Sequence, residues 1–377
     1  MNYLRKLRVG IDGRAFTSPA AGVRRYVSEL VPALLSIGAP LDVVVLGGSG
    51  ASLPAGVPHV SEPWHPPTNL VWAAVGLPRA ARRAAVDLIH APAYTAPLYS
   101  AVPVVLTIHD VSYERHPEWY PYRRDWLRRA FYRRSARAAS HILTDSEFSR
   151  GEIAAAYAID RDRITVAPLG ASADFDEGST SASLPAGVVA PFLLHVGDLH
   201  ERRNLSVVVK GLMEARHRLE TPAPALVLAG VDRGTGDRLA AEAGERGAPD
   251  AIVRLGAVSE STLRALYHGA AALVYPSRYE GFGLPLVEAM ASGTPVVAAD
   301  TSSIPEVVGP AGVLFPAGDH HALARAVGEL LDRPEGRRAL VERGLARARE
   351  FDWKATARKH ADVYRGVLAS RGAAESD

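Results

Sequence analysis

Two carboxylates, Glu280 and Glu288, flank a glycine turn with seven residues between them. The apolar run 271–275 before the turn predicts a buried strand, and the apolar segment 284–292 after it predicts a buried helix. Backbone N–H groups and the positive dipole end of such a helix favour a phosphate, which would lie on the backbone of Phe282, Gly283 and Leu284. We therefore expect a diphosphate on these amides, with one carboxylate on sugar hydroxyls and the other on ribose hydroxyls. Alone, each carboxylate has a plainer interpretation, as a loop charge or a structural helix residue.

Two arginines, Arg202 and Arg203, follow the apolar run 192–196. Ligands of open α/β sheets bind beyond the carboxyl ends of the strands, which is where this pair is expected. The pattern favours a clamp on a diphosphate, because guanidinium groups bind phosphate in a bidentate way. A solvated pair in front of a helix is the alternative.

The bulk composition excludes several classes of function. The chain has 377 residues, 47% of them hydrophobic, a formal net charge of +2 and no cysteine. Disulfides, cysteine zinc sites and thiol catalysis are therefore absent, and the balance of charge is too small to indicate a nucleic-acid partner. The N-terminus has no signal-peptide pattern and no apolar run reaches the length of a membrane span, so we expect a cytoplasmic protein.

Short apolar runs alternate with helical patterns along the whole chain, which predicts α/β architecture with parallel sheets. A stretch rich in Gly, Ser, Ala and Pro interrupts the alternation and reads as a linker. The predicted organisation is a first domain over 1–175, a linker over 176–191, a second domain over 192–352, a last helix over 353–370 and a disordered tail over 371–377.

The segment 280–288, EGFGLPLVE, resembles the E-x7-E motif of retaining glycosyltransferases with the GT-B fold, family 4 in particular. The flanking residues 276–277 and 289–297 agree with it. The resemblance implies two Rossmann-like domains that face each other across a cleft, with the last helix crossing back to the first domain. It also implies that Arg202 and Arg203 stand for a basic pair, often Arg-Lys, on the donor phosphates.

Further site residues follow from the same resemblance. Gly256 and Val258 match the segment that receives the nucleobase, Gly22 lies where backbone approaches the diphosphate, and His109 lies where a histidine faces the donor sugar. The pattern predicts a strand over 103–109 that ends at His109, and we expect Asp110 to orient this histidine. The implied catalytic pair is His109 and Glu280, and Glu288 is expected on the ribose.

The implied reaction moves a sugar from a nucleoside-diphosphate sugar to a hydroxyl of an acceptor sugar, a lipid-linked glycan or a small molecule, with retention of configuration. We expect no cofactor and no metal, because arginines, amides and a helix dipole can stabilise the leaving diphosphate. The likeness within the family points to mannosyltransferases of polysaccharide assembly and to GDP-mannose, with a UDP-sugar next. A GT-B phosphorylase, an epimerase and a non-catalytic nucleotide-sugar sensor are the alternatives.

Two other features bear on metals and membranes. The triplets 160–162 and 174–176 have the D-x-D pattern of metal-dependent transferases, but neither follows a strand as that site requires, so we read both as chance. The predicted helix 122–138 is crowded with arginines that scatter round its wheel. That scatter argues against a clean membrane-surface helix, although peripheral contact with a membrane, at its inner surface, stays open.

Overall fold

The computed structural model describes residues 6–48, 53, 56–62, 64, 66, 68–120, 124–172, 175, 183–216 and 224–374. Contacts divide the chain into two compact units. Unit 1 comprises Met1–Gly170 and Asp352–Asp377, and unit 2 comprises Ala171–Phe351. The predicted linker 176–191 lies outside the described residues over 176–182, and the rest of it belongs to unit 2.

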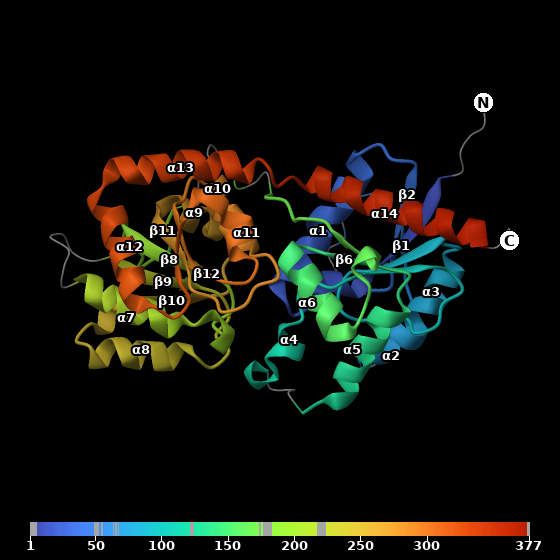
Figure 1. Cartoon of the computed structure of the whole chain (residues 1–377), viewed down its shortest axis with the longest axis horizontal. Helices are drawn as coiled ribbons and strands as arrows, with labels where there is room; N and C mark the ends of the chain where they lie inside the picture. The colour runs from blue at the N-terminus through green and yellow to red at the C-terminus, as the bar shows by residue number, and fades with distance from the viewer. Residues whose placement is uncertain are drawn as a thin grey trace. The chain divides into compact units, whose positions relative to one another are not determined.

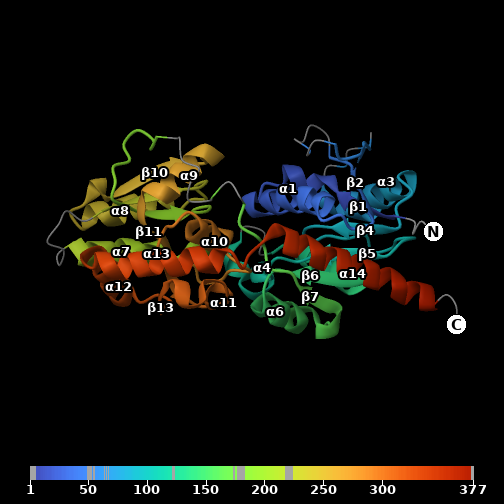
Figure 2. The ribbon, with the colours of Figure 1, turned by 90° about the horizontal axis from the view of Figure 1, so that it is seen from above.

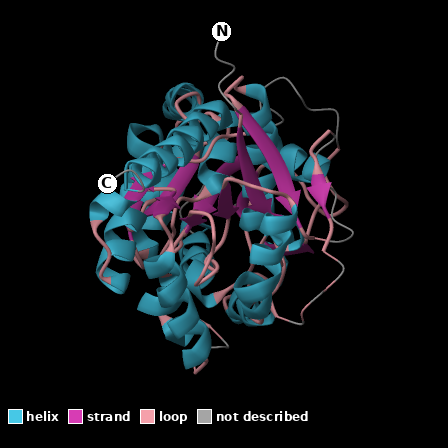
Figure 3. Cartoon of the chain, turned by 90° about the vertical axis from the view of Figure 1, so that its right-hand side faces the viewer, coloured by secondary structure: helices cyan, strands magenta, loops and turns pink. Residues whose placement is uncertain are grey.

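Unit 1 contains a seven-stranded parallel sheet in the order β3-β2-β1-β4-β5-β6-β7. Helices flank the strands of this sheet on both faces (Figure 3). The strands are β1 (Leu7–Asp12), β2 (Leu41–Leu46), β3 (His59–Val60), β4 (Leu88–Ala91), β5 (Val104–Thr107), β6 (His141–Thr144) and β7 (Ile164–Val166). The helices are α1 (Ala21–Ser36), α2 (Asn69–Val71), α3 (Leu77–Arg83), α4 (Ser112–Arg115), α5 (Trp126–Ala138), α6 (Glu147–Tyr157) and α14 (Trp353–Ala374).

The last helix, α14, packs along α1 and reaches β6, as Figures 1 and 2 show. It runs to Ala374, so the residues 371–374 that we predicted as a disordered tail are helical, and 375–377 lie outside the described residues. Residues 371–374 alone contain no signal for this extension, because a residue far away in the sequence supports it. Arg371 donates a hydrogen bond to the carbonyl of Ala101.

Unit 2 contains a six-stranded parallel sheet in the order β10-β9-β8-β11-β12-β13. The strands are β8 (Phe192–Val196), β9 (Ala225–Ala229), β10 (Ile252–Gly256), β11 (Ala270–Tyr275), β12 (Val296–Asp300) and β13 (Val313–Pro316). The helices are α7 (Leu205–Arg216), α8 (Gly236–Glu245), α9 (Glu260–Gly269), α10 (Leu284–Ala291), α11 (Ile304–Val308), α12 (His320–Asp332) and α13 (Pro334–Ala348). Strands β8 and β11 are fully buried, as parallel strands covered on both faces must be.

Each strand order reverses direction once, at β1/β4 in unit 1 and at β8/β11 in unit 2. Loops that leave two such neighbouring strands diverge to opposite faces of the sheet, which opens a crevice at their carboxyl ends. The crevice of unit 2 is therefore bordered by the loops after β8 and β11, which carry the two arginines and Glu280.

Three local predictions need correction. The strand expected over 103–109 ends at Thr107, so His109 lies beyond the strand rather than in it. The helix expected over 122–138 begins at Trp126, because the Asp125 carboxylate caps it by accepting the N–H of Arg128. The short strand β3 was not predicted, since its two residues pair only with the end of β2.

Candidate functional site

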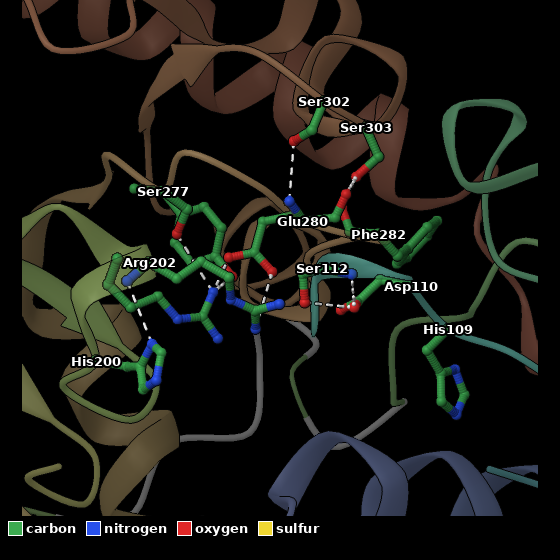
Figure 4. Close-up of polar contacts among 12 residues, drawn as sticks. His109, Asp110, Ser112, His200, Arg202, Ser277, Glu280, Phe282, Ser302 and Ser303 are labelled. Carbon is green, nitrogen blue, oxygen red and sulfur yellow. Dashed lines mark hydrogen bonds and ion pairs between the residues drawn. The ribbon is translucent and has the colours of Figure 1, made fainter. Parts of the chain in front are cut away.

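The loop between β11 and α10 is held in one conformation by serines that follow β12. The Oγ of Ser303 donates to the carbonyl oxygens of Glu280, at 2.9 Å, and Phe282, at 3.2 Å, while the Oγ of Ser302 accepts the N–H of Glu280 at 3.0 Å. Gly283 precedes α10 with φ 98°, a left-handed conformation that glycine adopts without strain. Distant serines thus fix the loop that the E-x7-E pattern predicted (Figure 4).

Glu280 is 5% exposed and lies against both predicted arginines. Arg203 forms an ion pair with its Oε1, and Nη2 of Arg202 lies 3.9 Å from its Oε2. Figure 4 shows Arg202 and Glu280 pointing toward each other from the loops after β8 and β11. The two arginines are therefore not simply solvated. They form a charged cluster with Glu280 where the strand order of the sheet reverses.

Arg203 has two further partners that sequence reasoning missed. Its Nη1 donates to the hydroxyl of Tyr275 at 2.7 Å and to the Oγ of Ser277 at 3.3 Å. Gly197, with φ 131°, provides space for the Arg203 side chain, because a Cβ at this position would lie 3.2 Å from the guanidinium group. Tyr275 and Ser277 directly precede the motif in the chain, and a strand-end hydroxyl beside an expected arginine was a signal that could have found them.

A buried histidine lies behind this cluster. His195 of β8 stacks on Tyr275 with ring centroids 5.9 Å apart. Burial, reinforced by the charge of Arg203, lowers the pKa of His195 to about 3. The ring is therefore neutral at pH 7, and its Nδ1 donates to the carbonyl of Val274.

Glu288 is also 5% exposed, on the buried side of α10. The hydroxyl of Tyr267, a fully buried residue of α9, donates to its Oε2 at 2.8 Å. A buried carboxylate needs such a partner. Tyr267 was not predicted, because nothing in the spacing of α9 and α10 shows that these two side chains meet.

The predicted nucleobase segment lies at the end of β10. Gly256 has φ 68° at an irregularity in the β9/β10 pairing, and a Cβ there would meet nothing within 4 Å. Val258 follows in the half-buried turn before α9. Gly230 follows β9, and a Cβ at this position would lie 2.0 Å from the carbonyl oxygen of Gly197. The ends of β8 and β9 therefore approach so closely that only glycine fits.

In unit 1, Gly22 lies in the first turn of α1, where a Cβ would meet nothing within 4 Å. The folded chain itself thus places no steric demand for glycine at this position. The nearby Asp12, at the end of β1, accepts hydrogen bonds from Trp72 Nε1 and the N–H of Arg14. Burial raises the pKa of Asp12 to about 6.

His109 is held by Asp145, and not by Asp110 as we predicted. Its Nδ1 donates to Oδ2 of Asp145 at 2.7 Å, while Asp110 accepts the N–H and hydroxyl of Ser112. Asp145 follows β6 as His109 follows β5, so adjacent parallel strands bring the two together at one sheet edge. An aspartate directly after the neighbouring strand was the signal that sequence reasoning overlooked.

The environment of His109 favours its charged form. Burial is the largest single influence and opposes the charge, but the carboxylates of Asp145 and Asp110 and the nearby carbonyl of Pro92 together outweigh it and raise the pKa of His109. Its Nε2 is buried and makes no hydrogen bond within the described part of the chain. Of the two ring nitrogens, Nδ1 is thus fixed by Asp145, and Nε2 makes no hydrogen bond to the residues that the structure describes.

Three groups of unit 2 that could hold a metal ion come together away from the predicted donor residues. Ligand atoms of Glu214, His320 and His321 lie within 4.8 Å of one another on α7 and α12. Sequence reasoning found no metal-ligand spacing, because Glu214 is remote in sequence from the two histidines. Of the D-x-D residues, Asp160 caps a turn through the N–H of Asp162, and the triplet 174–176 falls at Asp174 and Asp176 outside the described residues.

The arginines of α5 are largely paired within unit 1. Arg129 and Arg133 both form ion pairs with Glu114, and Arg128 pairs with Asp125. Arg137 donates to the carbonyl of Tyr157, whereas Arg123 lies outside the described residues. Within the described residues, no helix has the length and hydropathy needed to cross a membrane.

Two family models match the chain. The model described as glycosyl transferases group 1 matches residues 181–347, and the model described as glycosyltransferase family 4 matches residues 20–175. Among curated proteins, the O-antigen chain mannosyltransferase B of Escherichia coli is 34% identical over 275 residues, which cover 71% of each chain. The MMP alpha-(1->4)-mannosyltransferase of Mycolicibacterium hassiacum is 31% identical over 71% of this chain and 66% of its own.

Solved structures show the same fold at low identity. A sucrose-phosphate synthase from Thermosynechococcus elongatus superposes with a TM-score of 0.76 at 21% identity, covering 97% of this chain and 100% of its own. Anabaena HepE in complex with UDP and glucose superposes at 0.71 with 19% identity, over 96% and 100%. With the two parallel sheets, this likeness confirms the predicted GT-B fold. The chain belongs to glycosyltransferase family 4, the glycosyl transferases of group 1.

Proposed function

We propose that this glycosyltransferase moves mannose from a nucleoside-diphosphate sugar to an acceptor hydroxyl, with retention of anomeric configuration, in polysaccharide or glycoconjugate assembly. The observation that carries the proposal is the cluster of Arg202, Arg203 and Glu280 at the reversal point of the unit 2 sheet. Two guanidinium groups there match a diphosphate in charge and geometry. The buried carboxylate between them gives the same site a group that can hold the sugar.

In this proposal the arginines stabilise the negative charge that grows on the leaving diphosphate. Such preorganised charges contribute most where water is excluded, and Glu280 and its partners are largely buried. Binding of the donor would exchange part of the Arg203–Glu280 ion pair for phosphate oxygens. Glu280 would then be released toward the sugar, where positive charge develops at the anomeric carbon.

Each of the other predicted residues has a proposed role toward the donor within its own unit. Glu288, positioned by Tyr267, would accept the ribose hydroxyls, while the backbone of Gly256 and Val258 would receive the base. His109, with one nitrogen held by Asp145, would present Nε2 to a sugar hydroxyl. Gly22 leaves open space in which a diphosphate could approach the start of α1.

Mannose is proposed because two mannosyltransferases are among the similar proteins. The second candidate donor is a UDP-sugar, since Anabaena HepE was solved with UDP and glucose. The deciding experiment is a donor screen that measures nucleoside diphosphate release from GDP-mannose and UDP-glucose, with and without oligosaccharide acceptors. Release from GDP-mannose is expected; turnover of UDP-glucose alone would replace mannose in the proposal.

The proposed reaction uses no metal, because two arginines already balance the diphosphate charge. Activity should therefore survive EDTA. Loss of activity in EDTA that manganese restores would contradict this part. A Glu214→Gln variant separates the cluster with His320 and His321 from the donor site, because an effect of EDTA that persists in this variant cannot come from that cluster.

A further inference from the structure

A continuous series of hydrogen bonds runs through the interior of unit 1 and passes beside His109. The hydroxyl of Tyr26 lies 2.9 Å from Oγ1 of Thr107 and 2.7 Å from Nε2 of His360. The same Thr107 oxygen lies 2.8 Å from Nε2 of His90, whose Nδ1 lies 2.8 Å from the hydroxyl of Tyr364. Every one of these side chains is at most 1% exposed, so none of the bonds can be exchanged for water.

The hydrogen bond at one end of this series, between His360 and Thr356, determines which atom is the donor in each of the others. The carbonyl of Thr356 can only accept, so Nδ1 of His360, at 2.8 Å, is its donor. If the ring is neutral, its Nε2 then accepts from Tyr26, whose oxygen accepts from Thr107.

The same reasoning continues beyond Thr107. Its hydroxyl proton is given to Tyr26, so its oxygen accepts from Nε2 of His90. Nδ1 of His90 in turn accepts from the hydroxyl of Tyr364. One arrangement thus satisfies every donor of the series, and it requires both histidines to be neutral.

Both histidines are in the required form. Burial lowers the pKa of His360 to about 4, and burial, together with the electrostatic influence of the neighbouring His360 and His109, lowers the pKa of His90 well below its usual range. Of the three histidines, His109 is therefore the one whose surroundings raise the pKa and favour the charged form. The hydrogen-bonded side chains are thus a neutral, buried frame beside His109.

The frame contacts His109 directly. The ring of Tyr26 packs against the His109 imidazole with centroids 4.8 Å apart and planes at 82°. Asp145 fixes one nitrogen of that imidazole but leaves the ring able to turn about the bond to it. The perpendicular ring of Tyr26, the nearer of two aromatic rings that contact the imidazole, restricts that freedom.

We propose that Tyr26 is a positioning residue for His109, and that α14 takes part in the active site by holding the Tyr26 hydroxyl through His360. The inference rests on the proposed function of His109. It gives the last helix of the chain a role beyond packing, because His360 is 334 residues from Tyr26 in sequence and yet sets its orientation.

The test compares variants that remove one part of the frame each. Tyr26→Phe keeps the ring and loses the hydroxyl with its two buried hydrogen bonds, and should lower kcat roughly tenfold with KM for the donor nearly unchanged. Tyr26→Leu also removes the ring and should lower kcat further. Thr107→Ser should retain more activity than the isosteric Thr107→Val, which breaks the series.

The matched control is Tyr157→Phe, which removes a buried tyrosine hydroxyl of the same unit whose partner is Tyr113. This variant should keep kcat near that of the unaltered protein. Equal losses in Tyr26→Phe and Tyr157→Phe, or no loss in either Tyr26 variant, would overturn the proposal.

A spectroscopic measurement separates this inference from the function on which it rests. The imidazole resonances of His109, assigned with His109→Gln, should shift in Tyr26→Phe and not in Tyr157→Phe. If His109→Gln leaves kcat unchanged, the proposed role of His109 in the reaction is wrong. The resonances then test by themselves whether Tyr26 positions the His109 ring. Unshifted resonances in Tyr26→Phe would refute it.

Discussion

Unit 2 holds its candidate groups as charges on two loops, whereas unit 1 holds His109 on a buried frame of neutral side chains. In unit 2, Arg203 and Glu280 form an ion pair that a diphosphate can compete for. In unit 1, tyrosine, threonine and histidine side chains are satisfied by one another and leave one nitrogen of His109 without a partner among the described residues. The difference indicates a division of work between binding a charged ligand in unit 2 and orienting a reacting group in unit 1.

Glu280→Gln tests this division most severely. The change keeps the shape but removes the charge that would act on the sugar, so turnover should fall on the order of 10²-fold or more. Binding of nucleoside diphosphate, measured by calorimetry, should stay nearly intact, since Arg203 keeps its bonds to Tyr275 and Ser277. Glu288→Gln is the companion variant and should mainly weaken binding. Equal loss of affinity in both would show that the two carboxylates do not differ in role.

Arg203→Ala is expected to weaken nucleoside diphosphate binding by roughly 1.5–3 kcal/mol, the range for hydrogen bonds to charged groups. Arg203→Lys should fall between Ala and the native residue, because lysine keeps the charge and loses the bidentate geometry. Thermal unfolding must be followed in parallel, as the Ala change leaves Glu280 less well paired. Unchanged affinity in both variants would remove Arg203 from the donor site.

Asp145→Asn and Asp110→Asn together test which of the two aspartates holds His109 in unit 1. The first weakens the hydrogen bond and removes the charge that hold His109, and should lower kcat by about tenfold or more. The second removes the charge of Asp110 and weakens its bonds to Ser112, but it leaves the hydrogen bond between His109 and Asp145 in place, so kcat should fall less. Steady-state kinetics of the two proteins gives the answer, and a larger loss in Asp110→Asn would restore the role that we first predicted for Asp110.

Acid should destabilise both units through histidines that are kept neutral. Between an unfolded pKa of about 6.5 and the folded values of about 4 for His360 and about 3 for His195, the unfolded chain binds a proton that the folded chain does not. The free energy of unfolding therefore falls as pH falls, by about 1.4 kcal/mol per pH unit for each histidine. Asp12 acts in the opposite sense, because its pKa is raised to about 6 on folding.

The measurement is urea unfolding between pH 6 and 4 for His195→Gln, His360→Gln and the unaltered protein. In each variant, the dependence of the free energy of unfolding on pH should be smaller than in the unaltered protein, by about the contribution of one histidine. A slope that is unchanged in either variant would mean that the histidine concerned is not kept neutral by its unit.

Tyr267→Phe has the smallest expected effect. It removes one hydrogen bond to Glu288 and should weaken nucleoside diphosphate binding by about 1 kcal/mol while turnover at saturating donor stays similar. Isothermal titration with nucleoside diphosphate can resolve this change. A fall in turnover alone would place Glu288 among the groups that act during the reaction.

The sequence alone determined what is contiguous along the chain. The order of strands and helices, the glycine turn before α10 and the carboxylates on either side of it all follow from local periodicity and spacing. The strand β8 has the bounds of the apolar run 192–196, because a continuous apolar run is a signal contained within the strand's own residues.

Only the tertiary structure decided which side chains meet. Asp145 rather than Asp110 holds His109, Tyr267 holds Glu288, and Tyr26 meets His360 from the other end of the chain. These contacts depend on strand order and on helices that cross the sheet, and residues far apart in sequence carry no local record of them. A hydrogen bond requires placement within a few tenths of an ångström, and that precision comes from packing of the whole unit rather than from the spacing of its residues.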